Sequence, residues 1–227
     1  MDSSIFALAG SVCFATMMFA LVPGLFVFLI YYSIKKGAEN RQKWHQAAMS
    51  LGFEHRHGKT FWGTQTTGPM LGKREGFDVR ITTFTRSSGE HSSTHTSVEV
   101  LSPTNMNLGL HITPEGFFTG VSKMFGTQDI QVGDRTFDDV FLIKGNRPAD
   151  IIALLNPAVR QQLLTINAQH GSIKLTDQGT YQEWDGMITD AHRLASLIAP
   201  QVRLMTQLEQ AHSARVMANA EVGAAAW

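Results

Sequence analysis

The chain has 227 residues, and its 19 Lys and Arg balance 19 Asp and Glu, so its formal net charge at pH 7 is zero. This balance lacks the basic excess of a nucleic-acid-binding protein, and we expect no nucleic-acid partner. The single cysteine, Cys13, lies in an apolar N-terminal segment. The rest of the chain therefore cannot form a disulfide, a thiolate nucleophile or a thiolate zinc site.

Residues 5–32 contain no charged side chain. A helix needs roughly 20 apolar residues to cross a hydrocarbon core of about 30 Å, so this segment predicts one transmembrane helix. The alternative is a cleaved signal peptide, which has a positive n-region, a short apolar centre and a small-residue cleavage site. The only charged side chain before the apolar segment is that of Asp2, and Lys35-Lys36 follow the segment. These flanks favour a retained anchor.

Basic side chains gather just after the predicted anchor and outnumber the one acid there, Glu39. They are Lys35, Lys36, Arg41 and Lys43. The positive-inside rule places this side of the helix in the cytoplasm, where these cations also suit anionic lipid headgroups. We therefore expect a single-pass protein of the inner (cytoplasmic) membrane with its N-terminus outside. The expected divisions are residues 1–4 outside, 5–32 in the bilayer, a basic juxtamembrane helix over 33–52, a soluble domain over 53–215 and a tail over 216–227.

Two features of the apolar segment bear on contacts within the membrane. Pro23-Gly24 predict a mild kink, which membrane helices tolerate. Ala7, Ser11 and Ala15 recur every four residues, and such a small-residue stripe lets a second helix approach closely. Small residues are also common in membrane helices in general, so a specific helix–helix contact and ordinary composition both remain open.

The first half of the soluble domain is rich in predicted strands. Three segments alternate apolar and polar residues with a period of two, as half-buried antiparallel strands do. They are residues 77–82, 96–100 and 108–112. The polar residues 85–94 are expected to form a long hairpin loop between the first two strands.

Other short strands are expected around these three. Residues 61–62 and 70–71 predict a hairpin through Thr67-Gly68-Pro69, and further strands are expected at 130–132 and 140–143.

Helices dominate the second half of the domain. A short helix is expected over 148–155, and Asn156-Pro157 should cap and begin a second helix that ends near Gln169. A hairpin is expected around 177–179. The last helix contains Pro200, which should kink or divide it. The order of elements predicts one α+β domain with a mostly antiparallel sheet packed by helices and ending in a long kinked helix.

Closely spaced histidines raise the possibility of a metal site. His55 and His57 form one pair, and His91 and His95 form another. Zinc accepts histidine and carboxylate ligands, but no His-Glu-x-x-His motif is present. The second pair lies in or beside the expected serine-rich loop, which favours solvated histidines, so no cofactor is expected. A metal site at His91 and His95 is the weaker alternative.

Two further patterns favour turns over chemistry. Residues 68–74 resemble a phosphate-binding loop, but the spacing of the two glycines is one residue short and Arg74 stands where Ser or Thr is required. Four aspartates surround Gly133. They are Asp129, Asp134, Asp138 and Asp139. Paired carboxylates can bind a cation, but aspartates in turns commonly accept hydrogen bonds from the backbone, and we favour that interpretation.

The order of several motifs resembles a loose group of uncharacterised bacterial proteins that have an N-terminal membrane anchor and a cytosolic domain. The residues that carry the resemblance include 51–53, 76–81, 98–100, 107–110, 129–134, Phe137-Asp138, Phe141, 154–157 and Leu163-Leu164. Asn156 stands where Thr is usual in that group. The resemblance implies membrane attachment and a shared α+β fold, and it implies no catalytic residue.

No catalytic motif distinguishes the chain, which favours a non-enzymatic interaction, scaffold or accessory protein tethered to the lipid bilayer. Tethering raises the local concentration of a domain near a membrane-protein partner or a second copy of itself. A membrane-anchored sensor that binds a small ligand or lipid is the alternative. A metal-dependent hydrolase that uses His91 and His95 is the third hypothesis.

Overall fold

The computed structural model describes residues 3–56, 58, 60–61, 64–65, 67–89, 91–115 and 129–224. For residues 3–23, 60–61, 64–65, 88, 91 and 218–224 it describes the backbone only. The chain divides into two units, residues 1–45 and 46–227. Helix α1 (Ser3–Leu51) begins in the first unit and ends in the second.

The first unit consists of helix α1 up to His45. Its large apolar side chains over residues 25–32 are each between 46% and 65% exposed. Lys35, Lys36 and Lys43 follow and are also exposed, whereas Arg41 is partly covered. Within the part of the chain that the structure describes, no helix is both long enough and apolar enough to span a bilayer. The side chains of Ala7, Ser11 and Ala15 lie outside the described residues.

The second unit begins with the end of helix α1. Gly52 adopts a φ of 65°, which favours glycine, and its N–H bonds the Met49 carbonyl. The next N–H, that of Phe53, bonds the Ala48 carbonyl over 2.8 Å. This pair of bonds is the Schellman arrangement that ends helices. It turns the chain out of the helix and into the sheet.

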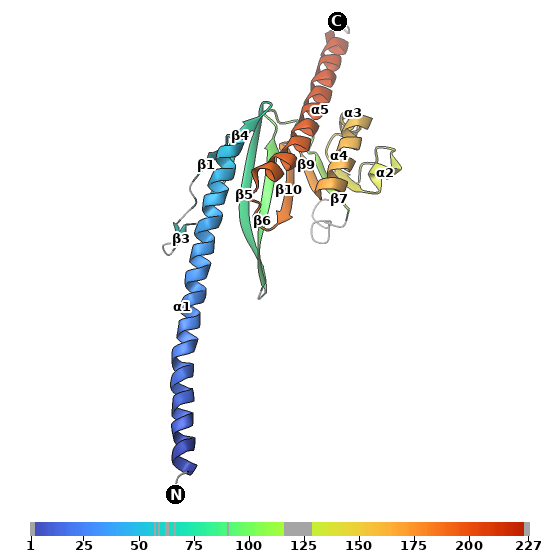
Figure 1. The fold of residues 1–227 in the computed structure, drawn as a ribbon. Helices are drawn as coiled ribbons and strands as arrows, with labels where there is room; N and C mark the ends of the chain where they lie inside the picture. The colour runs from blue at the N-terminus through green and yellow to red at the C-terminus, as the bar shows by residue number, and fades with distance from the viewer. Residues whose placement is uncertain are drawn as a thin grey trace. The chain divides into compact units, whose positions relative to one another are not determined.

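An eight-stranded antiparallel sheet forms the centre of the second unit (Figure 1). Its strand order is β1-β4-β5-β6-β10-β9-β7-β8. The strands are β1 (Glu54–His55), β4 (Met70–Arg74), β5 (Phe77–Ser88), β6 (His91–Leu101), β7 (His111–Pro114), β8 (Phe141–Lys144), β9 (Ile173–Thr176) and β10 (Gly179–Asp185). A separate small ladder joins β2 (Thr60–Phe61) and β3 (Thr64–Gln65).

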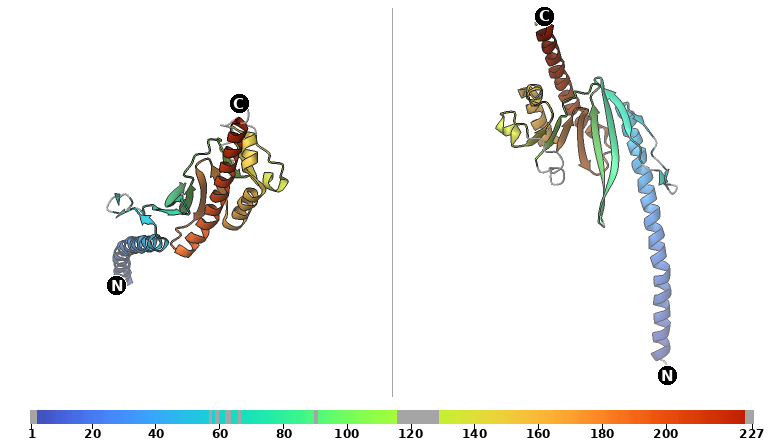
Figure 2. Two further views of the ribbon diagram at one scale, coloured as in Figure 1. Left: turned by 90° about the horizontal axis from the view of Figure 1, so that it is seen from above. Right: turned by 180° about the vertical axis from the view of Figure 1, so that it is seen from behind.

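Helices pack on one face of this sheet. They are α2 (Arg135–Asp138), α3 (Pro148–Leu154), α4 (Pro157–His170) and α5 (Ala191–Ala224). Helices α4 and α5 contact each other. Helix α4 also contacts β9, and α5 contacts β6 and β10. Figure 2 shows the long helix α5, in red, in two further views. The core between the layers is apolar: Val98 and Val100 of β6 and Leu204 of α5 are fully buried. This confirms the α+β class and the antiparallel sheet.

The opposite face of the sheet is polar, and we call it the open face. Successive side chains of a strand point to opposite faces, so the residues between the buried ones of β5, β6 and β10 share this face. In register they include Arg80 opposite Glu99, and Glu99 opposite Tyr181. The candidate site lies on this face.

Several predicted loops and strands are wrong. Residues 85–94 are not a long loop, because β5 and β6 continue to Ser88 and from His91. This segment extends past the ends of β4 and β10, so part of its backbone pairs only within the hairpin. Serines and threonines fit an exposed hairpin arm as well as a loop, which is why composition misled.

The expected pairing around Gly68 is also wrong. Strand β2 pairs with β3, and Met70 of β4 pairs with β1 and β5. Gly72 therefore lies inside a strand and not in a turn. It is packed against Phe53, whose ring would lie 2.0 Å from a Cβ at this position. Ile130 and Val132 form no strand, although the Ile130 N–H bonds the Ile143 carbonyl of β8.

Other predictions are confirmed. Asn156 caps α4, since its side chain accepts from the Val159 N–H over 3.1 Å. Strands β9 and β10 form the predicted hairpin. Helix α5 contains Pro200 and is not divided by it, and the kink stays a prediction.

Three of the four aspartates around Gly133 accept hydrogen bonds from backbone groups, as predicted, whereas Asp139 pairs with Arg135 at 3.7 Å. Asp134 caps α2, Asp138 accepts from the Val132 and Gly133 N–H groups, and Asp129 accepts from Ile143.

Candidate functional site

Polar side chains on the open face bond across the strands. Arg80 pairs with Glu99 at 3.4 Å, and the Thr82 and Ser97 hydroxyls lie 2.6 Å apart. Both are cross-strand pairs of β5 and β6, because the register sets Arg80 opposite Glu99 and Thr82 opposite Ser97.

The shortest ion pair among the described residues of this face joins β5 to β10. The Arg86 guanidinium donates to both carboxylate oxygens of Glu183, over 2.6 and 3.0 Å. The Tyr181 hydroxyl donates to the same carboxylate over 2.8 Å. Lys174 of β9 lies 5.5 Å from the centre of the Tyr181 ring, in cation–π range. A bidentate pair of this kind fixes the direction of the guanidinium as well as its position.

The pKa values of these groups follow from their contacts. Burial first, and then the hydrogen bond to Glu183 and its charge, raise the pKa of Tyr181 to about 12. Burial alone would raise the pKa of Glu183, but the hydrogen bonds from Arg86 and Tyr181 outweigh it and the net pKa is lowered. The hydrogen bond and charge of Glu183 raise the pKa of Arg86. At neutral pH the cluster is therefore one cation, one carboxylate and one neutral phenol.

A second polar cluster lies beside it, centred on His95 of β6. Its Nδ1 lies 3.0 Å from Asp185 Oδ1, and its Nε2 lies 2.8 Å from the Ser93 hydroxyl. A carboxylate only accepts, so Nδ1 carries the proton toward Asp185 and Nε2 accepts from Ser93. The imidazole stacks on the Phe84 ring, with the two ring centres 5.5 Å apart. The Arg86 guanidinium lies over the same ring, 5.3 Å from its centre. His95 is buried, although its partner Asp185 is 95% exposed.

The backbone after β10 holds Asp185 beside His95. The Gly186 N–H donates to the Thr94 carbonyl over 2.7 Å, and the Thr96 hydroxyl donates to the Gly186 carbonyl over 2.7 Å. The Ile188 N–H donates to the same hydroxyl over 2.9 Å. Gly186 has a φ of 82°, a conformation that favours glycine. The position of the carboxylate is thus set by backbone bonds to the histidine's own strand.

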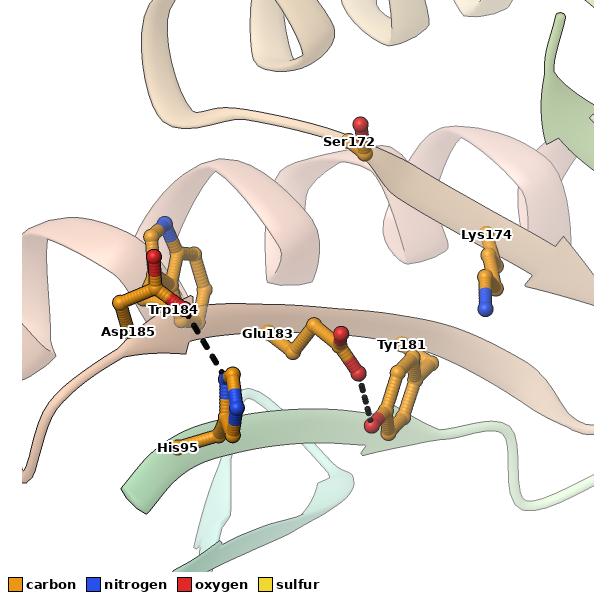
Figure 3. Close-up of a pocket in the computed structure, with 7 residues that line it drawn as sticks. All are labelled: His95, Ser172, Lys174, Tyr181, Glu183, Trp184 and Asp185. Atoms are coloured by element: carbon orange, nitrogen blue, oxygen red, sulfur yellow. Dashed lines mark hydrogen bonds and ion pairs between the residues drawn. The ribbon is translucent and has the colours of Figure 1, made fainter. Parts of the chain in front are cut away.

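A hollow of about 310 Å³ lies between these groups, at the lower end of the range for ligand pockets. Its lining residues are His95, Ser172, Lys174, Tyr181, Glu183, Trp184 and Asp185. Figure 3 shows His95 and Asp185 pointing toward each other. Lys174 of β9 and Ser172, which directly precedes β9, lie above Tyr181 and Glu183 in this view. The wall combines two carboxylates, an ammonium group and two aromatic rings, so it suits a small polar molecule better than an apolar one.

The predicted site residues lie on different elements of the chain. His95 was expected in a solvated loop and that is wrong, because it is a buried residue of β6. The side chain of His91 lies outside the described residues, as does that of His57. Among the described residues, no group of three His, Cys, Asp or Glu side chains is arranged to hold a metal ion. The basic residues Lys35, Lys36, Arg41 and Lys43 all lie on α1, in the first unit.

Sequence reasoning missed Arg86, Ser93, Glu183 and Asp185. Arg86 and Glu183 are 97 residues apart in the chain, so no local motif joins them. Extending the strand predicted at 96–100 back to His91 would have placed Ser93 and His95 on one face, because alternate residues of a strand share a face.

Comparisons with known proteins identify no family. No protein-family model matches the chain, and no curated protein matches it. One solved structure that matches is titled the crystal structure of the mycobacterial trehalose monomycolate transport factor A, TtfA. The match covers 76% of this chain and 93% of that one, at 12% identity and a TM-score of 0.46. A likeness at this level transfers no function to this chain.

Proposed function

We propose that this protein is a membrane-tethered interaction or accessory protein. Its N-terminal helix is held in the inner (cytoplasmic) membrane with the N-terminus outside. Its α+β domain lies in the cytoplasm, where it meets a membrane-protein partner or a second copy of itself. The charge-free residues 5–32 and the lysines that follow them support this proposal.

The observation that carries the tether is the apolar surface of α1. Eight consecutive large apolar or aromatic side chains, residues 25–32, are exposed all round the helix. A helix that is apolar on every side is stable only inside a protein core or a membrane. The exposed Lys35 and Lys36 come next, where the headgroup region would begin.

Membrane extraction of the full-length chain tests the tether. We expect the protein to stay in the membrane pellet after alkaline carbonate washing, and a chain that begins at Ser33 to be released. A reporter enzyme fused after Trp227 should be active only in the cytoplasm. Release of the full-length chain by carbonate, or reporter activity outside the cytoplasm, contradicts the proposal.

The open face supports the second part of the proposal, since the described helices α2 to α5 pack on the opposite face of the sheet. A photo-crosslinking residue at Lys73, which is exposed on the open face, should give an adduct of defined mass in native membranes. The matched control places the same residue at Gln161, which is exposed on α4. Adducts from neither position, or equally from both, contradict an interaction through the open face.

The hollow beside His95 favours a second candidate, a sensor that binds a small polar ligand. Its volume and its mixed charges suit such a ligand better than a lipid tail. A thermal-shift screen of polar metabolites tests this candidate. The matched variant Lys174→Met removes the ammonium group from the lining, so a true ligand should lose its stabilising effect on this variant.

A further inference from the structure

We propose that Ser93 is an activated nucleophile that accepts the acyl group of a small polar carboxylic ester, with His95 as its general base. This inference is independent of the membrane tether and adds a chemical activity to the open face. Asp185 orients the histidine, and Arg86 stabilises the negative charge that develops on the ester oxygen.

The order of atoms is that of a serine–histidine–carboxylate relay. Ser93 Oγ lies 2.8 Å from His95 Nε2, and His95 Nδ1 lies 3.0 Å from Asp185 Oδ1. Both distances fall in the range in which a base can take a proton from a nucleophile and be oriented by a third group. The two imidazole nitrogens have different partners, so the tautomer that leaves Nε2 free to accept a proton is the one that Asp185 favours.

The relay is held by the fold and not by chance contacts of flexible side chains. Ser93 and His95 are two residues apart on β6, so they point to the same face. His95 is buried and stacked on Phe84. The backbone bonds of Gly186 to Thr94 and Thr96 keep the end of β10 beside β6.

Arg86 supplies the electrophilic element. The register places it directly opposite Ser93, and cross-strand neighbours on one face have Cβ atoms about 4.5–5.5 Å apart. Its guanidinium carries five N–H donors, and its two bonds to Glu183 leave donors for an oxyanion. A preorganised cation of this kind stabilises charge as it develops in acyl transfer.

The hollow has His95 and Asp185 of the relay in its wall, whereas Ser93 and Arg86 are not among its lining residues. We therefore expect the hollow to hold only the part of the ester that lies beyond the reacting carbonyl. Its polar wall favours an ester with hydroxyl, amide or charged substituents. Because the relay is open to solvent at Asp185, water reaches the acyl group after the first step.

The reaction balances with the ester and water alone. Ser93 Oγ bonds to the carbonyl carbon and its proton passes to His95 Nε2. The carbon–oxygen bond to the alcohol then breaks, and the proton leaves with the alcohol. Water, deprotonated by His95, attacks the acyl-serine, and the free acid and the serine are regenerated.

A fluorophosphonate probe on the full-length protein in mild detergent tests the nucleophile. The Ser93 oxygen would bond to phosphorus, fluoride would leave, and His95 would take the proton. Intact mass should show one adduct, and peptide mapping should place it on Ser93. Ser93→Ala should abolish it, whereas Ser92→Ala, which changes the adjacent exposed serine on the other face, should not.

His95→Gln tests the base, and we expect at least about 100-fold slower labelling, the lower limit for a positioned general base. A thermal melt of this variant shows whether it is folded, and Ser93→Ala gives an independent answer if it is not. Asp185→Asn should slow labelling by only about tenfold, or about 1.4 kcal/mol, because water screens a carboxylate that is 95% exposed. No adduct on Ser93, equal labelling of Ser92 and Ser93, or full-rate labelling of folded His95→Gln overturns the proposal.

Discussion

Asp177, in the turn between β9 and β10, should be one of the residues that most affect the stability of the domain. Its carboxylate accepts from three successive backbone N–H groups, those of Leu108, Gly109 and Leu110, over 2.7–3.2 Å. Leu108 and Leu110 are fully buried, and these bonds fix the chain just before β7. We therefore predict that Asp177→Ala destabilises the domain strongly.

The expected loss can be calculated from the bonds. A hydrogen bond to a charged group contributes about 1.5–3 kcal/mol, and a buried donor without a partner costs about 1–3 kcal/mol. These three donors are partly buried and water reaches some of them, so we take about 1 kcal/mol for each. The expected loss is about 3 kcal/mol, a large fraction of the roughly 5–15 kcal/mol that stabilises a typical domain. The variant should still fold.

Urea unfolding of the full-length chain in mild detergent, followed by tryptophan fluorescence, measures this loss. The control is Asp78→Ala, because within the described part of the chain Asp78 forms an ion pair with the exposed Lys73, at 3.5 Å. Such surface pairs contribute at most about 1 kcal/mol. If both variants lose the same stability, or if Asp177→Ala loses less than about 1 kcal/mol, the reasoning from the three N–H bonds is refuted.

Three further predictions concern other contacts. Tyr181 should ionise near pH 12, and Glu183→Gln should lower that pKa by removing the charge beside the phenol; absorbance titration against Tyr181→Phe measures both pKa values. Because the folded state favours the neutral phenol, the free energy of unfolding should fall as the pH rises from about 10 to about 12, and urea unfolding at these pH values against Tyr181→Phe measures this loss. Thr180→Val should cost about 1–3 kcal/mol in urea unfolding, since it leaves the buried Gln201 oxygen without its donor, whereas Thr180→Ser should cost less. Asn156→Ala should cost about 1 kcal/mol by the same measurement, and Asn156→Asp should retain the cap.

Local chemistry explains which elements could be predicted. The cap at Asn156 and the β9–β10 hairpin follow from side chains that act on neighbouring backbone. Apolar and polar residues alternate along 77–82 and 96–100 because only one face of these strands is buried. By contrast, residues 85–94 carry no such alternation, because this hairpin arm extends past its neighbouring strands and neither face is required to be apolar.

The candidate site could not be predicted because its bonds cross between strands that are distant in the chain. Arg86 and Glu183 come together only when β6 lies between β5 and β10, and that order is a property of the whole sheet. His95 was predicted as a loop histidine for the same reason: its burial depends on Phe84 of the neighbouring strand.

The sequence by itself determined the charge-free segment 5–32, the α+β class and the turn and cap residues, since these depend on composition and on contacts a few residues apart. Only the tertiary structure decided which polar residues face one another on the open face. The pairing of β6 with both β5 and β10 places Ser93, His95, Asp185 and Arg86 in one cluster, because antiparallel register converts distant positions into direct neighbours.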